Sequence, residues 1–182
     1  ALTIILKRND PSAVAKQVSL TELGSIKINK EERGKMLKAI PRNSVIGFLI
    51  GVLPGAGATI ASFLAYGMER NFVSDEEKEK FGKGSVHGLT APETANNAAC
   101  SGAFVPLLTL GIPGSGTTAV MLGALLGFGI QPGPRLYITN PEIFWSVIMS
   151  MYIGMVVLLI LNLPLIPYIA RILAVPKNYL IP

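Results

Sequence analysis

Charged residues are absent from three long stretches of the chain, residues 43–68, 94–134 and 143–170. A helix needs about 20 residues to cross the hydrocarbon core of a bilayer, and each stretch is long enough to do so. The charged residues that remain gather between these stretches instead of alternating with apolar residues inside them. This pattern predicts an all-α integral membrane protein whose charge-free stretches form transmembrane helices.

Two of the charge-free stretches contain a matching segment, LPGAGAT at residues 53–59 and IPGSGTT at residues 112–118. Each proline removes a backbone donor and disfavours helical geometry in the residue before it, while the following glycines permit positive φ. A continuous helix is therefore expected to break at Pro54 and at Pro113. Inside a membrane, broken backbone is tolerated only where protein buries it or where it lines a wet cavity. We therefore expect two discontinuous or re-entrant hairpin segments.

The arms beside the first break, residues 43–53 and 58–68, contain 11 residues each. Each arm would make about 16 Å of helix, roughly half of the hydrocarbon thickness. Such arms suit either one broken span or a hairpin that dips to the middle of the membrane and returns, and the flanking charges do not decide between the two. Residues 141–170, by contrast, are expected to form a plain spanning helix, with Trp145 and Tyr168 at the membrane interfaces.

Each break should start a new half-helix, with Thr59 or Thr118 as its cap and with free N–H groups and the positive dipole end inside the membrane. Such a helix end can hold a carboxylate without a cationic side chain. Paired broken segments also indicate the binding site of a secondary transporter, although small residues that only pack are the structural alternative. The candidate substrate-binding residues are Gly55, Ala56, Gly57, Thr59, Gly114, Ser115, Gly116, Thr117 and Thr118.

The segment GIPGSGTT at residues 111–118 also has the spacing of a phosphate-binding P-loop, but Thr117 occupies the position of the lysine. Residues 94–134 offer neither a cation for a phosphate nor a carboxylate for magnesium, so nucleotide binding is disfavoured. His87 has no second His or Cys at metal-ligand spacing, and we expect it to be a loop or interface residue. Without a nucleophile and base or a metal cluster in the pattern, we expect neither an enzyme nor a cofactor beyond a coupling ion.

The polar segments indicate the orientation of the chain. Residues 1–42 hold nine Lys or Arg against four acidic residues and directly precede a charge-free stretch. By the positive-inside rule this basic segment is cytoplasmic or lies on the membrane surface, and residues 43–182 form the transmembrane transport region. Residues 69–83 within that region are predicted to be a solvated polar loop or a short surface helix. The interspersed acidic residues and the adjoining membrane segment argue against nucleic-acid binding.

The segment TAPETANNAACSG, which starts at Thr90, combines a capping motif with polar residues in an apolar environment. Thr90 and Glu93 have the spacing of a capping box, so a helix is expected over residues 91–110 with Glu93 as a structural cap. The functional alternative is a polar helix face that helps to bind the coupling cation. That face would consist of Glu93, Asn96 and Asn97.

Two stretches of the chain resemble the large membrane subunit of the tripartite tricarboxylate transporter family, over most of residues 40–180. They are GFLIGVLPGAGATIASFLAYGMER and FGKGSVHGLTAPETANNAACSGAFVPLLTLGIPGSGTTAVMLGALLGFGIQPGP. The resemblance implies a multi-pass subunit of an uptake system in the bacterial inner membrane, driven by sodium or protons. It also implies a small membrane subunit and a periplasmic substrate-binding protein that delivers a carboxylate such as citrate. Because family members are several times longer and the chain opens on Ala1, we expect a fragment.

Three functions are compatible with the sequence. The leading hypothesis is the large transmembrane subunit of a binding-protein-dependent, cation-coupled secondary transporter for tricarboxylates or dicarboxylates. The alternative is a membrane channel, or another anion transporter, that uses the Pro-Gly loops as a filter or site; two non-identical loops in one chain favour a transporter. The third is a membrane scaffold whose glycines serve only packing.

Overall fold

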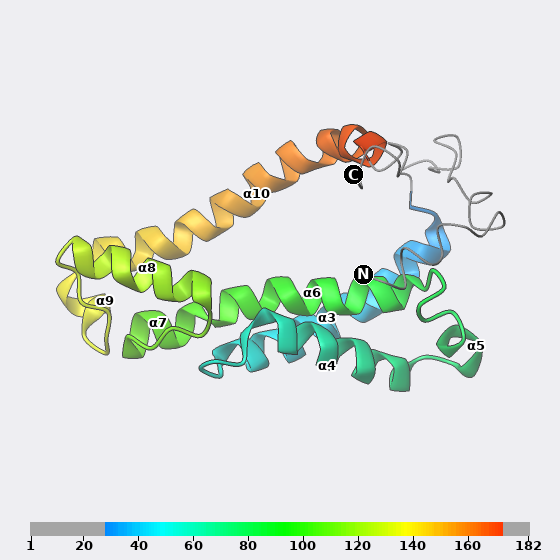
Figure 1. Cartoon of the computed structure of the whole chain (residues 1–182), viewed down its shortest axis with the longest axis horizontal. Helices are drawn as coiled ribbons and strands as arrows, with labels where there is room; N and C mark the ends of the chain where they lie inside the picture. Colours follow the sequence, from blue (N-terminus) through cyan, green and yellow to red (C-terminus); the bar gives the residue numbers. More distant parts are fainter. Residues whose placement is uncertain (1–27, 173–182) are drawn as a thin grey trace, which may run out of the picture. The chain divides into compact units, whose positions relative to one another are not determined.

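The computed structural model describes residues 28–172, so residues 1–27 of the predicted basic segment lie outside the described part of the chain. The described residues form helices and connecting turns without a strand, which confirms the all-α prediction. One compact unit spans Ile28–Ile148, and the last helix continues from Met149 onward. The helices are α3 (Lys30–Val52), α4 (Gly57–Phe72), α5 (Asp75–Lys78), α6 (Val86–Gly102), α7 (Phe104–Leu110), α8 (Gly116–Gly127), α9 (Leu136–Thr139) and α10 (Pro141–Ile172) (Figure 1).

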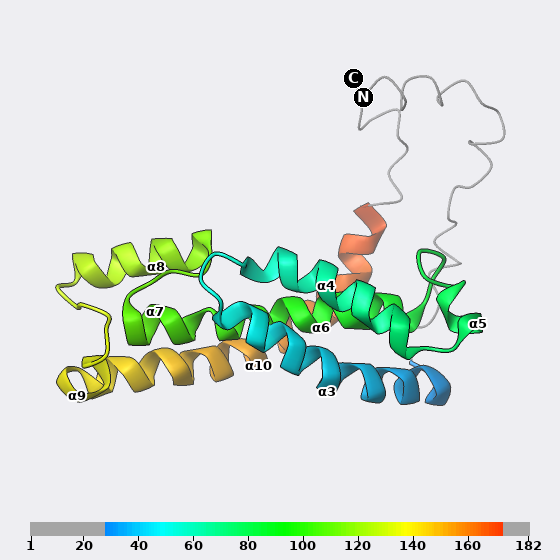
Figure 2. The same cartoon turned by 90° about the horizontal axis from the view of Figure 1, so that it is seen from below.

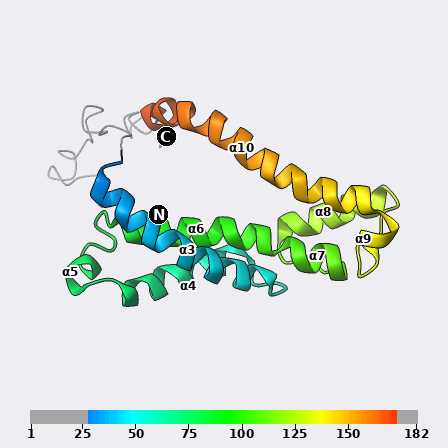
Figure 3. The ribbon, with the colours of Figure 1, turned by 180° about the vertical axis from the view of Figure 1, so that it is seen from behind.

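Helices α3, α4 and α6 pack together as the centre of the compact unit. α3 and α6 run side by side in the same direction, and α4 returns antiparallel to both (Figures 2 and 3). Most buried positions in each helix recur at every fourth residue and carry small side chains, so they form a narrow stripe along which two backbones can approach. These positions are Ala39, Asn43, Gly47 and Gly51 in α3, Ala61, Ala65 and Glu69 in α4, and His87, Ala91, Ala95 and Ala99 in α6.

The contact between α3 and α6 depends on glycines that have no side chain. A Cβ atom built on Gly47 would overlap the carbonyl oxygen of Ala95, and one built on Gly51 would overlap that of Ala99. Gly102 of α6 approaches the backbone of α3 in the same way. Close backbone contact of this kind gains dispersion energy along the whole seam without large side chains, as is common between helices in membranes.

Helix α3 begins with a reciprocal capping box. Asn29 Oδ1 accepts the Glu32 N–H at 2.7 Å, and Glu32 Oε2 accepts the Asn29 N–H at 2.9 Å. From there the helix continues through Pro41 to its last residue. The predicted end of the basic segment, at residue 42, lies inside this continuous helix.

The prediction of one helix over residues 91–110 is wrong. Helix α6 begins earlier, because the hydroxyl of Ser85 accepts the Gly88 N–H at 3.1 Å and caps the helix there. α6 and α7 are then separate helices. Thr90 and Glu93 consequently lie inside α6 and form no capping box, so the structural explanation for Glu93 does not hold.

Helices α7, α8 and α9 share a second, smaller apolar core with the first turns of α10. The Gly133 N–H donates to the Leu108 carbonyl at 3.1 Å and so ties the loop after α8 to α7. The three buried members of this core come from three different helices, and partly buried residues surround them. The buried members are Leu108, Leu125 and Leu136, and the surrounding residues are Phe104, Ile130, Ile143, Phe144 and Val147.

Within the described residues, α10 contains the one segment that is long and apolar enough to cross a membrane, Pro141–Ile166. Its 26 residues give about 39 Å of helix, more than the ~30 Å of a hydrocarbon core. Trp145 and Tyr168, near the two ends of α10, are exposed. The expected helix over residues 141–170 is therefore present. The membrane spans expected from the other two charge-free stretches stay a prediction.

Candidate functional site

The first Pro-Gly segment joins two antiparallel helices by a tight turn. The Ala56 N–H donates to the Leu53 carbonyl at 3.2 Å, and the chain re-enters a helix at Gly57, whose φ is 67°. An L-residue other than glycine adopts such a φ only with strain. The N-cap, Ala56, makes no side-chain hydrogen bond, and Thr59 is exposed in the helix. The prediction that Thr59 caps this helix is wrong, because backbone bonds close the turn and α4 starts two residues before Thr59.

The second Pro-Gly segment has a different geometry. Helix α7 ends at Gly111, which is left-handed at a φ of 69° and lies against the carbonyl of Pro132. The following residues return along α7, so that Gly114 packs against Ala103 at the start of that helix. Helix α8 therefore begins beside the beginning of α7, and the two helices run in the same direction (Figures 1 and 2).

Ser115 and Thr118 cap the start of α8 together. Ser115 Oγ accepts the Thr118 N–H at 3.3 Å, and Thr118 Oγ1 accepts the Ser115 N–H at 2.8 Å. Ser115 is thus the N-cap, and Thr118, expected to be the cap, is its reciprocal partner three residues later. Both hydroxyl groups are engaged with the helix itself. The N–H groups of Gly116 and Thr117, in the first turn, have no acceptor within the helix and lie in exposed residues.

The two Pro-Gly segments meet. The carbonyl oxygen of Gly114 lies 4.0 Å from the position that a Cβ of Gly57 would occupy, and Gly114 also faces the carbonyl of Gly51 at the end of α3. Helices α4 and α8 leave this point in opposite directions, so that their first turns face one another (Figure 2). Two positive helix ends thus come together where the sequence provides no charged side chain.

This arrangement offers backbone hydrogen-bond donors to an anion. The first turn of α4 has no side-chain cap, and the first turn of α8 keeps two free N–H groups, so both offer donors to an oxyanion. The last carbonyls of α3 and α6 lie at the same end of the three-helix unit. Their oxygen atoms are the negative ends of those helices.

The polar residues of α6 do not contact the meeting point of the breaks. Glu93 and Asn97 are exposed on the side of α6 away from its packed alanine stripe, whereas Asn96 is half-buried at the flank of that stripe. Asn97 Nδ2 donates to the Glu93 carbonyl at 2.8 Å. Within the described residues, no hydrogen bond or ion pair joins these three side chains to either Pro-Gly segment.

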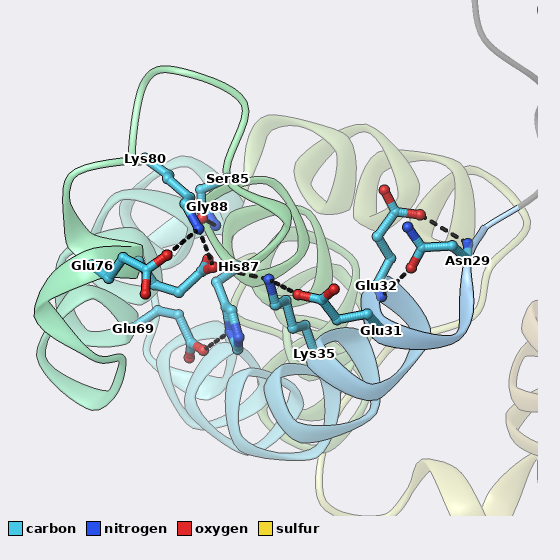
Figure 4. A network of polar contacts seen from close by, with 11 residues as sticks. Asn29, Glu31, Glu32, Lys35, Glu69, Glu76, Lys80, Ser85, His87 and Gly88 are labelled. Atoms are coloured by element: carbon cyan, nitrogen blue, oxygen red, sulfur yellow. Dashed lines mark hydrogen bonds and ion pairs between the residues drawn. The ribbon is translucent and has the colours of Figure 1, made fainter.

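Sequence analysis missed a buried charge cluster at the other end of the same three helices. Arg42 of α3 forms two hydrogen bonds with Glu69 of α4, Nη2 to Oε1 at 2.6 Å and Nε to Oε2 at 3.0 Å. Asn43 Nδ2 donates to Glu69 Oε2 at 2.8 Å. His87 Nδ1 of α6 lies 2.8 Å from Glu69 Oε1 (Figure 4). Glu69 is completely buried and His87 nearly so. The interpretation of Glu69 as part of a solvated loop is wrong, and His87 lies in the first turn of α6 and not in a loop.

A separate polar network ties the short helix α5 to α3. Lys35 Nζ lies 2.8 Å from both Glu31 and Glu77, and Lys80 binds Glu76 and Glu77 (Figure 4). Hydrogen bonds from Lys35 and then Lys80 hold the pKa of Glu77 below its usual value. Surface pairs of this kind contribute little stability individually, so their main effect is to position the connection between α4 and α6.

One shallow groove on α4 and α6 is too apolar to bind a carboxylate. It measures about 310 Å³ and is lined by Ser62, Phe63, Tyr66, Gly88 and Pro92. Of the hydroxyl-bearing residues in its lining, Ser62 and Tyr66, Ser62 Oγ already lies within hydrogen-bond distance of the carbonyls of Ala58 and Pro92, at 3.0 and 3.2 Å. The candidate site is the meeting point of the two Pro-Gly segments, where the beginnings of two helices lie together.

The described part of the chain is all-helical and contains one apolar helix suited to a membrane, and its two Pro-Gly segments lie together in a charge-free region. The chain belongs to the tripartite tricarboxylate transporter TctA family, whose model matches residues 1–182. This confirms the resemblance that the Pro-Gly segments indicated.

Two curated proteins of Agrobacterium vitis are similar to the chain. The "Uncharacterized 52.8 kDa protein in TAR-I ttuC' 3'region" is 39% identical over 175 residues, 96% of this chain and 34% of the relative. The "Uncharacterized protein in TAR-II ttuC' 3'region" is 46% identical over 136 residues, 75% of this chain and 55% of the relative. The chain thus spans about a third and about half of the lengths of these relatives. No solved structure matches the chain significantly.

Proposed function

We propose that the chain is part of the large transmembrane subunit of a binding-protein-dependent, cation-coupled secondary transporter. Its substrates are tricarboxylates or dicarboxylates such as citrate, which it carries across the bacterial inner membrane as a multi-pass protein. A small membrane subunit and a periplasmic substrate-binding protein are its partners, and the lipid bilayer surrounds it. The observation that supports this proposal best is the approach of Gly57, the first residue of α4, to Gly114, which directly precedes the N-cap of α8.

The substrate carboxylate is held by the N–H groups at the two facing helix ends. A region without charged side chains can bind a carboxylate through backbone donors, and hydrogen bonds to a charged group contribute about 1.5–3 kcal/mol each. Ser115 and Thr118 hold the start of α8 in place, while Gly116 and Thr117 offer donors. The complete proposed site consists of Gly55, Ala56, Gly57, Thr59, Gly114, Ser115, Gly116, Thr117 and Thr118.

A channel is the weaker alternative. A selectivity filter is built from equivalent loops that repeat around a pore. Here the first Pro-Gly segment is a turn between antiparallel helices, whereas the second returns along α7 and leads into a parallel helix. Two loops of different geometry favour an asymmetric binding site over a symmetric filter.

The variant Gly116→Pro tests the substrate site by removing one backbone donor. Proline is tolerated at the first helical position, Ser115 before it is extended at a φ of −155° and a ψ of 168°, and no atom lies within 4 Å of the added Cβ. We expect Gly116→Pro in the full-length transporter to lower uptake of labelled citrate at subsaturating concentration about tenfold or more, because a charged hydrogen bond is lost.

Gly116→Ala is the matched control, because it adds the same Cβ and keeps the N–H. It should transport like the wild type at equal membrane abundance. Equal uptake by the proline and alanine variants, at equal abundance, would show that the Gly116 N–H does not contact the substrate and would remove the main support for the proposed site.

The polar face of α6 is proposed to help bind the coupling cation, sodium or a proton, through Glu93, Asn96 and Asn97. An exposed carboxylate on a helix beside charge-free sequence is costly in lipid, so this face should line a wet cavity. We expect Glu93→Gln to raise the sodium or proton concentration needed for half-maximal uptake severalfold, with the KM for the carboxylate nearly unchanged at saturating cation. Glu79→Gln, on an exposed residue next to α5, is the control. A wild-type cation dependence of Glu93→Gln would contradict the role of Glu93.

A further inference from the structure

The buried cluster around Glu69 has no part in the proposed substrate site. It brings one charged or titratable side chain from each of three helices to a single point, Arg42 from α3, Glu69 from α4 and His87 from α6. The four donors around the carboxylate leave neither of its oxygens unpaired. A completely buried carboxylate is costly unless it is paired in this way.

The hydrogen bonds determine which nitrogen of the His87 ring carries hydrogen. Glu69 accepts two hydrogen bonds from the guanidinium of Arg42, so its carboxyl group is ionised and has no hydrogen to donate. His87 Nδ1, 2.8 Å from Glu69 Oε1, must therefore be the donor. In the neutral ring this leaves a lone pair on Nε2, which is the atom that can take up a proton.

Nε2 of His87 belongs to the exposed edge of the ring. The side chain of His87 keeps 9% of its surface exposed, and its Nε2 makes no hydrogen bond within the described residues. Among the described residues, Asn43 Oδ1 is the one buried side-chain polar atom without a hydrogen-bond partner. Because Nε2 also has no partner but is not such a buried atom, it is accessible to solvent. A proton can therefore reach Nε2 without opening the cluster.

We propose that His87 Nε2 is a proton-binding site and that its occupancy changes how α6 is held to the α3–α4 hairpin. With a neutral ring, the charges of Arg42 and Glu69 cancel. With a protonated ring, Glu69 bridges two cations, and the hydrogen bond from Nδ1 to Oε1 becomes charge-assisted and stronger. Because the same oxygen accepts Arg42 Nη2, proton uptake strengthens the α4–α6 contact at the expense of the α3–α4 contact.

The other charged groups near the cluster are few. α3 contributes Arg42 together with the amide of Asn43, and α4 contributes Glu69. On α6 itself, Glu93 lies on the opposite side of the helix. The network of Lys35, Glu31, Glu76, Glu77 and Lys80 has no hydrogen bond or ion pair with His87 in the described part of the chain. A proton at Nε2 therefore gives the cluster one net positive charge, and within the described residues Glu69 is the one carboxylate hydrogen-bonded to the ring.

Nuclear magnetic resonance of the full-length protein in nanodiscs, labelled with ¹³C and ¹⁵N at histidine, tests proton binding without depending on transport. The His87 signal is the one that disappears in His87→Gln. If that variant does not fold, the signal is identified in the wild type by dipolar coupling between ¹⁵Nδ1 and a ¹³C-labelled glutamate carboxyl carbon. We expect spectra recorded over a series of pH values to show a form with hydrogen on Nδ1 alone and, at lower pH, a form with hydrogen on both nitrogens. A ring that stays in one neutral form throughout would overturn the proposal.

The consequence for transport rests on the proposed function and is measured separately. Wild type and His87→Gln are compared for carboxylate uptake between about pH 5.5 and about pH 8 at saturating sodium and matched abundance. We expect the wild type to change severalfold over this range and the variant to be flat. Equal pH profiles would overturn the effect on helix contact, whereas absence of carboxylate uptake by the wild type at every pH would count against the proposed function and leave the proton site standing.

Discussion

Replacing Gly47 by alanine is expected to destabilise the full-length protein by about 3 kcal/mol, the upper end of the usual range for overpacking. The added Cβ would overlap the carbonyl oxygen of Ala95, which is helix backbone and cannot turn away as a flexible side chain would. The neighbouring contact of Gly51 with Ala99 holds the two helices at the same separation, so α3 and α6 must separate along the seam. Thermal unfolding of the purified protein in detergent should show a midpoint several degrees below that of the wild type.

Gly34→Ala is the matched control on the same helix. Gly34 lies in α3 with no atom within 4 Å of an added Cβ. Alanine stabilises a helix by about 0.5–1 kcal/mol relative to glycine, so this variant should unfold at or slightly above the wild-type temperature. Equal thermal unfolding midpoints of Gly47→Ala and Gly34→Ala would contradict the close contact between α3 and α6.

The second large effect is expected when the ion pair of Arg42 and Glu69 is broken on one side. Glu69→Gln leaves the guanidinium of Arg42 without its counter-ion next to buried groups. Removing one partner of a buried ion pair typically lowers the stability by about 3–5 kcal/mol. The side chain of Arg42 is 31% exposed, so water partly compensates and we expect about 3 kcal/mol. Denaturation midpoints and membrane abundance of Glu69→Gln measure the loss.

The double variant Arg42→Gln with Glu69→Gln separates the charge effect from a general loss of packing. It removes both charges and keeps groups that can form hydrogen bonds, so it should recover at least half of the stability lost in Glu69→Gln. A double-mutant cycle then gives the coupling between the two residues. Strictly additive losses would mean that the two side chains do not interact.

The apolar helices were predictable because their patterns are local. Three charge-free stretches, the matched Pro-Gly segments and the long run over residues 141–170 do not depend on what they pack against, since lipid selects against charge and proline breaks a helix by its own chemistry. Helices do end before both Pro-Gly segments and begin again after them. The start of α6 was missed because Ser85 and Thr90 are both residues that can cap a helix. Which of them does so depends on the conformation of the preceding loop, which the local pattern does not give.

The spacing of the buried residues is visible in the sequence, but the charge cluster that Glu69 and His87 form is not. Glu69 follows Ala61 and Ala65 at a spacing of four, and His87 precedes Ala91 at the same spacing, which places both on faces of small residues. That spacing predicts burial on one face of a helix. It does not identify the partner helix, so the charge run that starts at Glu69 was interpreted as solvated.

The sequence by itself determined the helical content of this protein and the family to which it belongs, because composition, backbone chemistry and short motifs act over a few residues. Only the tertiary structure shows that the two Pro-Gly segments meet, and that the first is a turn whereas the second is an extended return along α7. It alone also shows that Glu69 of α4 pairs with both Arg42 of α3 and His87 of α6. These features depend on which helix lies beside which and in what register. Register follows from close packing of backbones at Gly47 and Gly51, where contacts join residues far apart in the chain.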